Sequence, residues 1–107
     1  MKSIMQGTTP SVTFTINTDD FLLSDVAKVE LYVRNDSVLK TYGTDDLTID
    51  TETNTIVKDF TEEETAAFIP KKSVIIQGRC WLNNGKVIGI NKVYYDVADM
   101  EGVGRDG

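Results

Sequence analysis

Apolar residues recur at every second position over much of this chain. Val12, Phe14 and Ile16 alternate with threonines, and residues 28–34 repeat the pattern with charged and aromatic residues between the aliphatic ones. Successive side chains of a β-strand point to opposite faces of a sheet, so a period of two predicts strands with one buried face. Both segments are therefore expected in antiparallel sheets that cover a core on one side.

The pair Asn84-Gly85 is the strongest turn signal in the chain. Both residues tolerate positive φ, and a two-residue turn of this kind closes a tight β-hairpin. Such a turn pairs Asn83 with Lys86 and places Trp81 opposite Ile88. One face of the hairpin then faces the core, and the other is expected to collect Ile75, Trp81, Ile88, Ile90 and Tyr94.

Two further hairpins and one helix are expected from local signals. Asn35-Asp36 indicates a turn between two strands, and the polar run 51–54 indicates another. Residues 61–68 carry the pattern of a short helix, since Thr61 can cap its first turn and Glu64, three residues later, can complete a capping box. Pro70 ends this helix within about two turns.

These elements predict an all-β chain of about eight short strands, with the one helix at 61–68 in a connection. A two-layer antiparallel β-sandwich of immunoglobulin-like character is the simplest architecture that buries the apolar stripes. The expected organisation is a single domain over 1–98. Residues 99–107 are expected to form a flexible tail, because the end of the chain is polar and rich in glycine.

Composition limits the classes of partner. The 107 residues carry a formal net charge of −6, and the isoelectric point is about 4.5. Nucleic acids and anionic membrane surfaces are therefore unexpected partners, since both require clustered Lys and Arg. The sequence contains no apolar run long enough for a signal peptide or a membrane span, so synthesis in the cytoplasm and a soluble protein are expected.

The residue types also argue against an enzyme. The chain has no histidine and one cysteine, which excludes Ser-His-Asp and Cys-His catalysis and histidine or multi-cysteine metal sites within one chain. Cys80 is expected to be a buried, unreactive thiol on the core face of its strand. The aspartate pairs, such as Asp19-Asp20, lack the spacing of a calcium loop and are better explained by turns and solubility. We therefore expect no catalytic, cofactor-binding or metal-binding residues.

Two segments are candidates for an interaction surface. The apolar second face of the hairpin offers Trp81, Ile88, Ile90 and Tyr94, and aromatic residues provide large contact areas at low entropic cost. The segment 2–6 has one charge and is expected to be an edge strand, which offers Lys2, Ile4 and Gln6. The alternative is that the aromatic residues only cover their own ribbon and that segment 2–6 only closes the domain's own sheet.

Several segments resemble a family of phage proteins. Residues 1–10 with the strand 12–16, residues 26–33, the helix 61–68 and residues 74–79 resemble small proteins encoded among the tail and baseplate genes of phages and prophages of Gram-positive gut Firmicutes. The chain also resembles, more distantly, the immunoglobulin-like N-terminal domain of upper baseplate proteins of siphophages. The resemblance implies a virion-associated β-module without enzymatic activity, made in the cytoplasm of the bacterial host and then incorporated into the virion.

The expected function is thus that of a non-enzymatic structural or assembly module of a phage or prophage virion. Its expected partners are other virion proteins and a second copy of itself. The alternative is a carbohydrate-binding or adhesin-like β-sandwich, which would bind a glycan.

Overall fold

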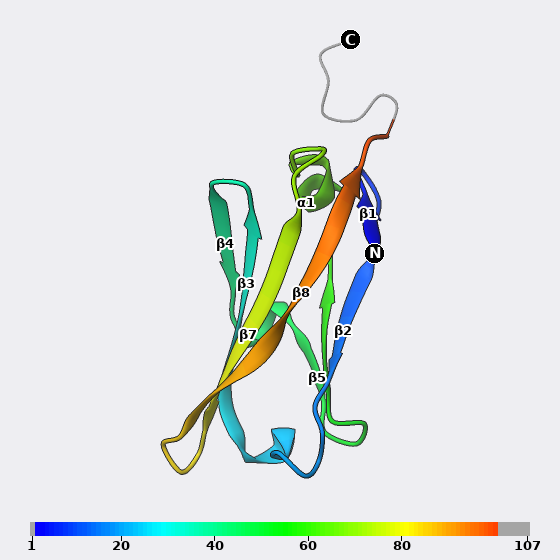
Figure 1. The fold of residues 1–107 in the computed structure, drawn as a ribbon. Helices are drawn as coiled ribbons and strands as arrows, with labels where there is room; N and C mark the ends of the chain where they lie inside the picture. The colour runs from blue at the N-terminus through cyan, green and yellow to red at the C-terminus, as the bar shows by residue number, and fades with distance from the viewer. Residues whose placement is uncertain (1, 101–107) are drawn as a thin grey trace.

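The chain forms two facing β-sheets. The structure, a computed structural model, describes residues 2–100. The strands of the described part are β1 (Ser3–Met5), β2 (Ser11–Thr15), β3 (Val26–Asn35), β4 (Val38–Tyr42), β5 (Thr48–Asp50), β6 (Thr55–Asp59), β7 (Val74–Leu82) and β8 (Val87–Ala98). The expected all-β, two-layer sandwich of eight strands is confirmed (Figure 1). The expected flexibility of the tail stays a prediction, because 101–107 lie outside the described residues.

One sheet has five strands in the order β1-β8-β7-β3-β4, and the other has three in the order β2-β6-β5. All pairs are antiparallel except β1 and β8, which run parallel from Ser3↔Asp96 to Met5↔Ala98. This pair departs from the expected antiparallel arrangement. β1 and β8 come from opposite ends of the chain, so no hairpin sets their relative direction, and β1 leads directly into β2 of the other sheet.

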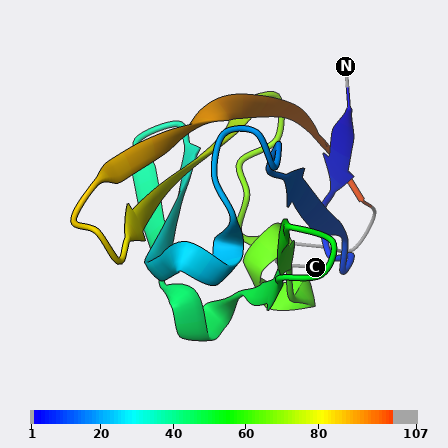
Figure 2. The same cartoon turned by 90° about the horizontal axis from the view of Figure 1, so that it is seen from below.

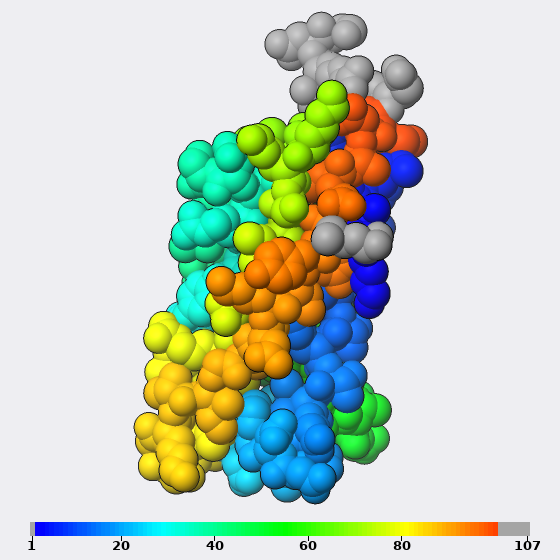
Figure 3. Space-filling view, viewed as in Figure 1, coloured from blue at the N-terminus to red at the C-terminus, as the bar shows by residue number. Residues whose placement is uncertain are grey.

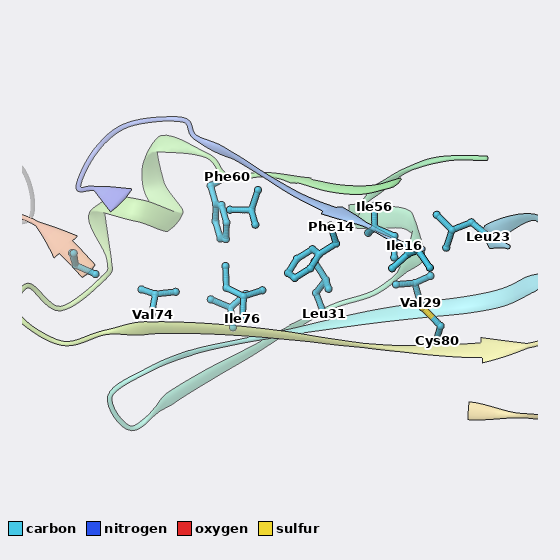
Figure 4. Close-up of a cluster of buried hydrophobic side chains, with 13 residues drawn as sticks. Phe14, Ile16, Leu23, Val29, Leu31, Ile56, Phe60, Val74, Ile76 and Cys80 are labelled. Atoms are coloured by element: carbon cyan, nitrogen blue, oxygen red, sulfur yellow. The ribbon is translucent and has the colours of Figure 1, made fainter. Parts of the chain in front are cut away.

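The core lies between the sheets and is built from the alternating residues. Phe14 of β2 and Ile16, just after it, point toward Leu31 of β3 and Cys80 of β7 (Figure 4). Leu31, Ile56 and Cys80 are fully buried. At roughly 25 cal/mol per Å² of apolar surface removed from water, each buried aliphatic side chain contributes about 1.5–3 kcal/mol. The period-two pattern therefore identified the buried faces of β2 and β3 correctly, and the hairpin register correctly placed Cys80 on the buried face of β7.

Three hairpins connect neighbouring strands. β3 and β4 are joined by Asp36 and Ser37, with Asp36 at φ 58°, and β5 and β6 are joined by the polar run 51–54. Both hairpins were expected. The third hairpin, between β7 and β8, forms where Asn84-Gly85 predicts it, but its loop has a different length.

The β7–β8 loop has three residues instead of two. The Leu82 amide donates to the Lys86 carbonyl at 2.8 Å, the Gly85 amide donates to the Leu82 carbonyl at 3.0 Å, and Gly85 has φ 91°. A turn followed by a glycine in the left-handed region is the usual three-residue hairpin. Trp81 consequently pairs with Val87, and the expected pairing of Trp81 with Ile88 is wrong.

A β-bulge in β8 restores the expected register farther from the turn. Gly78 pairs with Ile90 and Ile76 pairs with Val93, so β8 carries one more residue than β7 in this interval. The bulge offsets the longer loop, and the expected pairs Ile76–Val93 and Ile75–Tyr94 are correct. Gly78 has no room for a side chain, since an added Cβ would lie 2.8 Å from Cδ1 of Ile90.

A single α-helix, α1 (Glu62–Ala66), occurs in the part of the chain that the structure describes, together with two 3-10 turns, η1 (Leu23–Asp25) and η2 (Thr44–Asp46). α1 is shorter than the expected 61–68, but its capping box is present. The Glu64 amide donates to Thr61 Oγ1 at 3.1 Å, and the Thr61 amide donates to Glu64 Oε1 at 2.8 Å. The 3-10 turns were not expected, because three-residue turns leave no periodicity in the sequence.

Between residues 2 and 100 no helix has the length and apolar character needed to span a bilayer.

Candidate functional site: the outer face of the five-stranded sheet

The solvent side of β3, β7 and β8 carries an unusual set of side chains, which we call the outer face. Alternation places these residues opposite one another across the strands, as in the pairs Lys28↔Trp81 and Glu30↔Arg79. The three strands lie side by side across the molecular surface (Figure 3). The outer face consists of Lys28, Glu30, Tyr32, Arg34, Ile75, Gln77, Arg79, Trp81, Val87, Lys92, Tyr94 and Asp96.

A hydrogen-bonded network lies at the centre of the outer face. The Tyr32 hydroxyl donates to Glu30 Oε1 at 2.6 Å and accepts from the Arg79 guanidinium at 2.8 Å. Glu30 is also 3.4 Å from Lys28 Nζ and 3.9 Å from Arg79. Because each side chain restrains the next, the network presents charged groups in one arrangement at a reduced entropic cost of binding.

The protonation states of this network follow from its contacts. The hydrogen bond from Tyr32 is the largest of the causes that lower the pKa of Glu30 below its ordinary value, and Lys28 acts in the same direction. Burial, followed by the hydrogen bond to Glu30, raises the pKa of the Tyr32 phenol. Glu30 is thus an anion and Tyr32 a neutral donor throughout the physiological pH range.

Trp81 is contacted by two cations. Lys28 Nζ and the Arg79 guanidinium carbon each lie 4.5 Å from the centre of the indole ring. Cation–π contacts of this kind stabilise by about 0.5–1 kcal/mol at exposed sites. They also occupy aromatic surface that a ligand ring would otherwise use.

A shallow depression of about 320 Å³ opens beside this network, lined by Tyr32, Arg34, Leu39, Ile75, Gln77 and Lys92. Its apolar walls come from β3, β4 and β7, and its rim carries two cations, Arg34 and Lys92. Within residues 2–100 neither cation forms an ion pair. An apolar side chain flanked by carboxylates would fit this depression.

The expected interaction residues do not all lie on this face. Trp81 and Tyr94 do, and Tyr94 is 48% exposed. Ile88 and Ile90 lie on the core side of β8, because the longer loop shifts β8 by one residue and so exchanges its two faces there. The outer neighbour of Trp81 is instead Val87, which is 49% exposed.

The N-terminal candidates are likewise divided. β1 forms an edge of the five-stranded sheet, as expected for an edge strand, and Lys2 beside it is exposed. Ile4 and Gln6 are buried, at 2% and 4% exposure, and Gln6 Nε2 donates to the Phe68 carbonyl at 2.8 Å. These two side chains belong to the packing of the domain, so they are not available as a contact surface.

Sequence reasoning missed the cations of the outer face. Lys28, Arg34, Arg79 and Lys92 were not among the expected interaction residues. For Lys28 and Arg34 the sequence contains an indication, because the charged residues of β3 alternate with the buried valines and leucine. Only the register between β3 and β7 shows that they meet the aromatic residues.

A second hollow lies between β4 and α1, with a volume of about 240 Å³. Lys58 is buried next to it, with Nζ 3.1 Å from Glu64 Oε2 and 4.0 Å from the centre of the Tyr42 ring. Burial and the neighbouring Glu64 raise the pKa of Tyr42 above its ordinary value. This cluster ties α1 to both sheets, and its polar groups are already paired, so it is a structural feature.

Metal-binding side chains do not gather in the described part of the chain, where no group of three or more Cys, Asp and Glu residues is arranged to hold an ion. Cys80 is fully buried among core side chains.

We expect the Cys80 thiol to be inert in the folded protein. Burial raises its pKa to about 11, so only about one thiol in a thousand is ionised at pH 8. Iodoacetamide should alkylate the native chain at least about 100-fold more slowly than the chain unfolded in guanidinium. Alkylation at equal rates in both states would show that Cys80 is accessible.

No protein-family model matches the chain, and no curated protein sequence matches it. The chemistry of the outer face is therefore the basis for the function proposed below.

Proposed function

We propose that the chain is a non-enzymatic assembly module that binds another protein through the outer face. The observation that carries this proposal is the charge distribution. The chain has a net charge of −6, yet the outer face presents four cations, Lys28, Arg34, Arg79 and Lys92, against the two carboxylates of Glu30 and Asp96. A cationic patch on an anionic domain orients the domain toward an acidic surface and rejects other partners.

The side chains of the outer face fit a protein partner better than a glycan. Aromatic residues and arginine are the residue types enriched in protein interfaces, and here they lie on a flat, rigid sheet. A sugar ring that stacked on Trp81 would have to displace Lys28 or Arg79 from the indole. Glycan binding therefore remains the alternative, and a glycan array tests it directly.

The resemblance to phage tail and baseplate proteins supports a place in a phage or prophage virion. The partner would then be another virion protein with an acidic contact surface. An immunoglobulin-like assignment of the sandwich is supported by strand order, since β2-β6-β5 and β3-β7-β8 correspond to strands B-E-D and C-F-G of that fold.

The test is a pull-down with the products of the genes adjacent to this one, followed by titration of any protein retained. Arg34→Glu combined with Lys92→Glu should weaken binding about 100-fold, because losing two complementary charge contacts and adding repulsion costs on the order of 3 kcal/mol. Affinity of the unaltered chain should also fall as salt is raised.

The matched control is Lys71→Glu combined with Lys72→Glu. It makes the same change of charge in the exposed loop before β7, which is not part of the outer face, and its affinity should remain within about threefold of the unaltered chain. Equal loss of binding in both double variants would show that net charge alone matters. Absence of any retained neighbour, together with a positive glycan array, would replace the proposal by the carbohydrate-binding alternative.

A further inference from the structure

β2 has one side without a strand partner. It is an edge of the three-stranded sheet, and its ladder runs only to β6. The Ile16 amide donates to the Asn54 carbonyl and the Phe60 amide donates to the Pro10 carbonyl, both at 2.9 Å. Ile16 and Pro10 are both even-numbered, and in an antiparallel ladder every second residue of a strand hydrogen-bonds to the same neighbour. The backbone groups of the odd-numbered residues Ser11, Thr13 and Thr15 therefore point away from β6.

This edge carries none of the usual protection against strand pairing. Residues 11–15 include no charged residue and no proline, and β2 pairs with β6 without a bulge. The adjacent stretch of β8, by contrast, is protected by the bulge between Ile90 and Val93 and by the charge of Lys92. Natural sheets use bulges, lysine and proline to block unwanted pairing, so of the two the edge of β2 is the receptive one.

A groove runs between β2 and β8, and apolar side chains form its floor. Ile88, Ile90 and Val93 point to the core side of β8 but remain only partly buried, because β1 continues the sheet only as far as the pairs at Asp96, Val97 and Ala98. The groove holds about 810 Å³ beside the C-terminal half of β2. β8 arches over this region in the end-on view (Figure 2).

The apolar floor and the charged ends of the groove define the kind of segment that could bind there. A second copy paired through its own β2 would not serve, since its Val12, Phe14 and Ile16 are already buried in its own core. The occupant must bring free apolar side chains on one face and backbone groups along one edge. Asp19 and Asp20 lie at one end of the groove system and Lys2 lies at the other, so complementary charges are favoured at the ends of the occupant.

We propose that β2 accepts an extended segment of a partner protein as an additional strand. The segment spans about six residues, or about 20 Å. It hydrogen-bonds to the backbone of Ser11, Thr13 and Thr15, and every second side chain is apolar and covers Ile88, Ile90 and Val93. A basic residue lies near Asp19 and Asp20, and an acidic residue lies near Lys2. This site is separate from the outer face, which lies on the opposite side of the five-stranded sheet.

The proposal is tested by selecting peptides that bind the full chain from a displayed library of random decapeptides. Thr13→Pro is the blocked variant, because it removes an amide that points outward while leaving the ladder to β6 intact. Thr13→Val is the control, since it keeps the amide. Selected peptides should alternate apolar and polar residues, with opposite charges at their two ends, and should bind Thr13→Pro at least tenfold more weakly than Thr13→Val.

Two readouts keep the test independent of the folding of the proline variant. Alternate N-methylation of a selected peptide should abolish binding in one register and spare it in the other, as only one edge of a strand faces β2. Amide hydrogen exchange at Thr13 and Thr15 should slow at least tenfold on binding. Peptides without a period of two, equal binding to both Thr13 variants, or amides at Thr13 and Thr15 already protected in the free chain would each overturn the proposal.

Discussion

Glu64→Gln is expected to lower the free energy of unfolding by about 3 kcal/mol, because it removes the counter-charge of a buried lysine. The Lys58 side chain is 6% exposed, and its Nζ lies 3.2 and 3.1 Å from the two carboxylate oxygens of Glu64. Glutamine can still complete the capping box with Thr61, so the substitution isolates the loss of charge. Urea denaturation measures the effect.

Two control variants separate the ion pair from the helix. Glu63→Gln makes the same change at the preceding position, where the side chain is exposed, and should change stability by less than about 0.5 kcal/mol. Combining Lys58→Met with Glu64→Gln should recover much of the loss, since an apolar side chain of similar size needs no counter-charge. A double variant as unstable as the sum of its parts would show that the two residues do not interact.

The same pair makes stability depend on pH. Burial acts to raise the pKa of Glu64, but the Tyr42 hydroxyl, the Thr61 amide and the Lys58 ammonium outweigh it and hold the pKa below the ordinary 4.5. A carboxyl with a lowered folded pKa stabilises fully above its unfolded pKa. This contribution should therefore be lost as pH falls below about 4.5, and Glu64→Gln should remove that part of the pH dependence.

Asn54→Ala is expected to cost about 3 kcal/mol as well, equivalent to a fall in Tm of roughly 12–24 °C for a domain of this size. The Asn54 side chain is buried and accepts from the Leu23 amide at 2.8 Å, while Nδ2 donates to the Ile16 carbonyl at 2.9 Å and the Phe21 carbonyl at 3.1 Å. Alanine at position 54 leaves these three backbone groups without the side chain that bonds to them. The φ of 56° at this position is also unfavourable for alanine.

Asn54→Gly separates the two causes, since glycine tolerates positive φ but supplies no side-chain hydrogen bonds. It should remain destabilised, though less than Asn54→Ala. Asn84→Ala is the matched control, because Asn84 makes one exposed hydrogen bond, to the Lys86 amide. Asn84→Ala should cost less than about 1 kcal/mol. If calorimetry gave Asn54→Ala the same Tm as Asn84→Ala, the hydrogen bonds of the Asn54 side chain would not stabilise the fold.

Local patterns in the sequence determined the local structure. Alternation identified β2 and β3 and their buried faces, and turn residues located all three hairpins and, through the third, the buried face of β7. Thr61 and Glu64 identified the start of α1 through a capping box that spans three residues. Each of these features depends on contacts close in sequence, or on the period of a strand, so single-sequence reasoning can reach it.

The sequence predicted only part of the candidate site. Trp81 and Tyr94 were candidates for the surface and lie on the outer face, but Ile88 and Ile90 were placed on the wrong face because a loop one residue longer exchanges the faces of β8 near the turn. Ile4 and Gln6 were expected at the surface, because the sequence of an edge strand does not reveal which elements pack over it. β1 lies beside β8, and the Phe68 carbonyl holds Gln6 in place.

Tertiary structure alone decided the two surfaces from which we infer binding. The outer face exists because the register between β3 and β7 sets Lys28 beside Trp81 and Glu30 beside Arg79, residues about 50 positions apart in the chain. The open edge of β2 exists because β1 joins the other sheet and leaves one side of β2 without a strand partner. By itself, the sequence determined which residues form strands and which of their faces are apolar. Which strands become neighbours, and in what register, depends on the packing of the whole core, because pairing between distant segments is stabilised only when all the apolar faces are buried together.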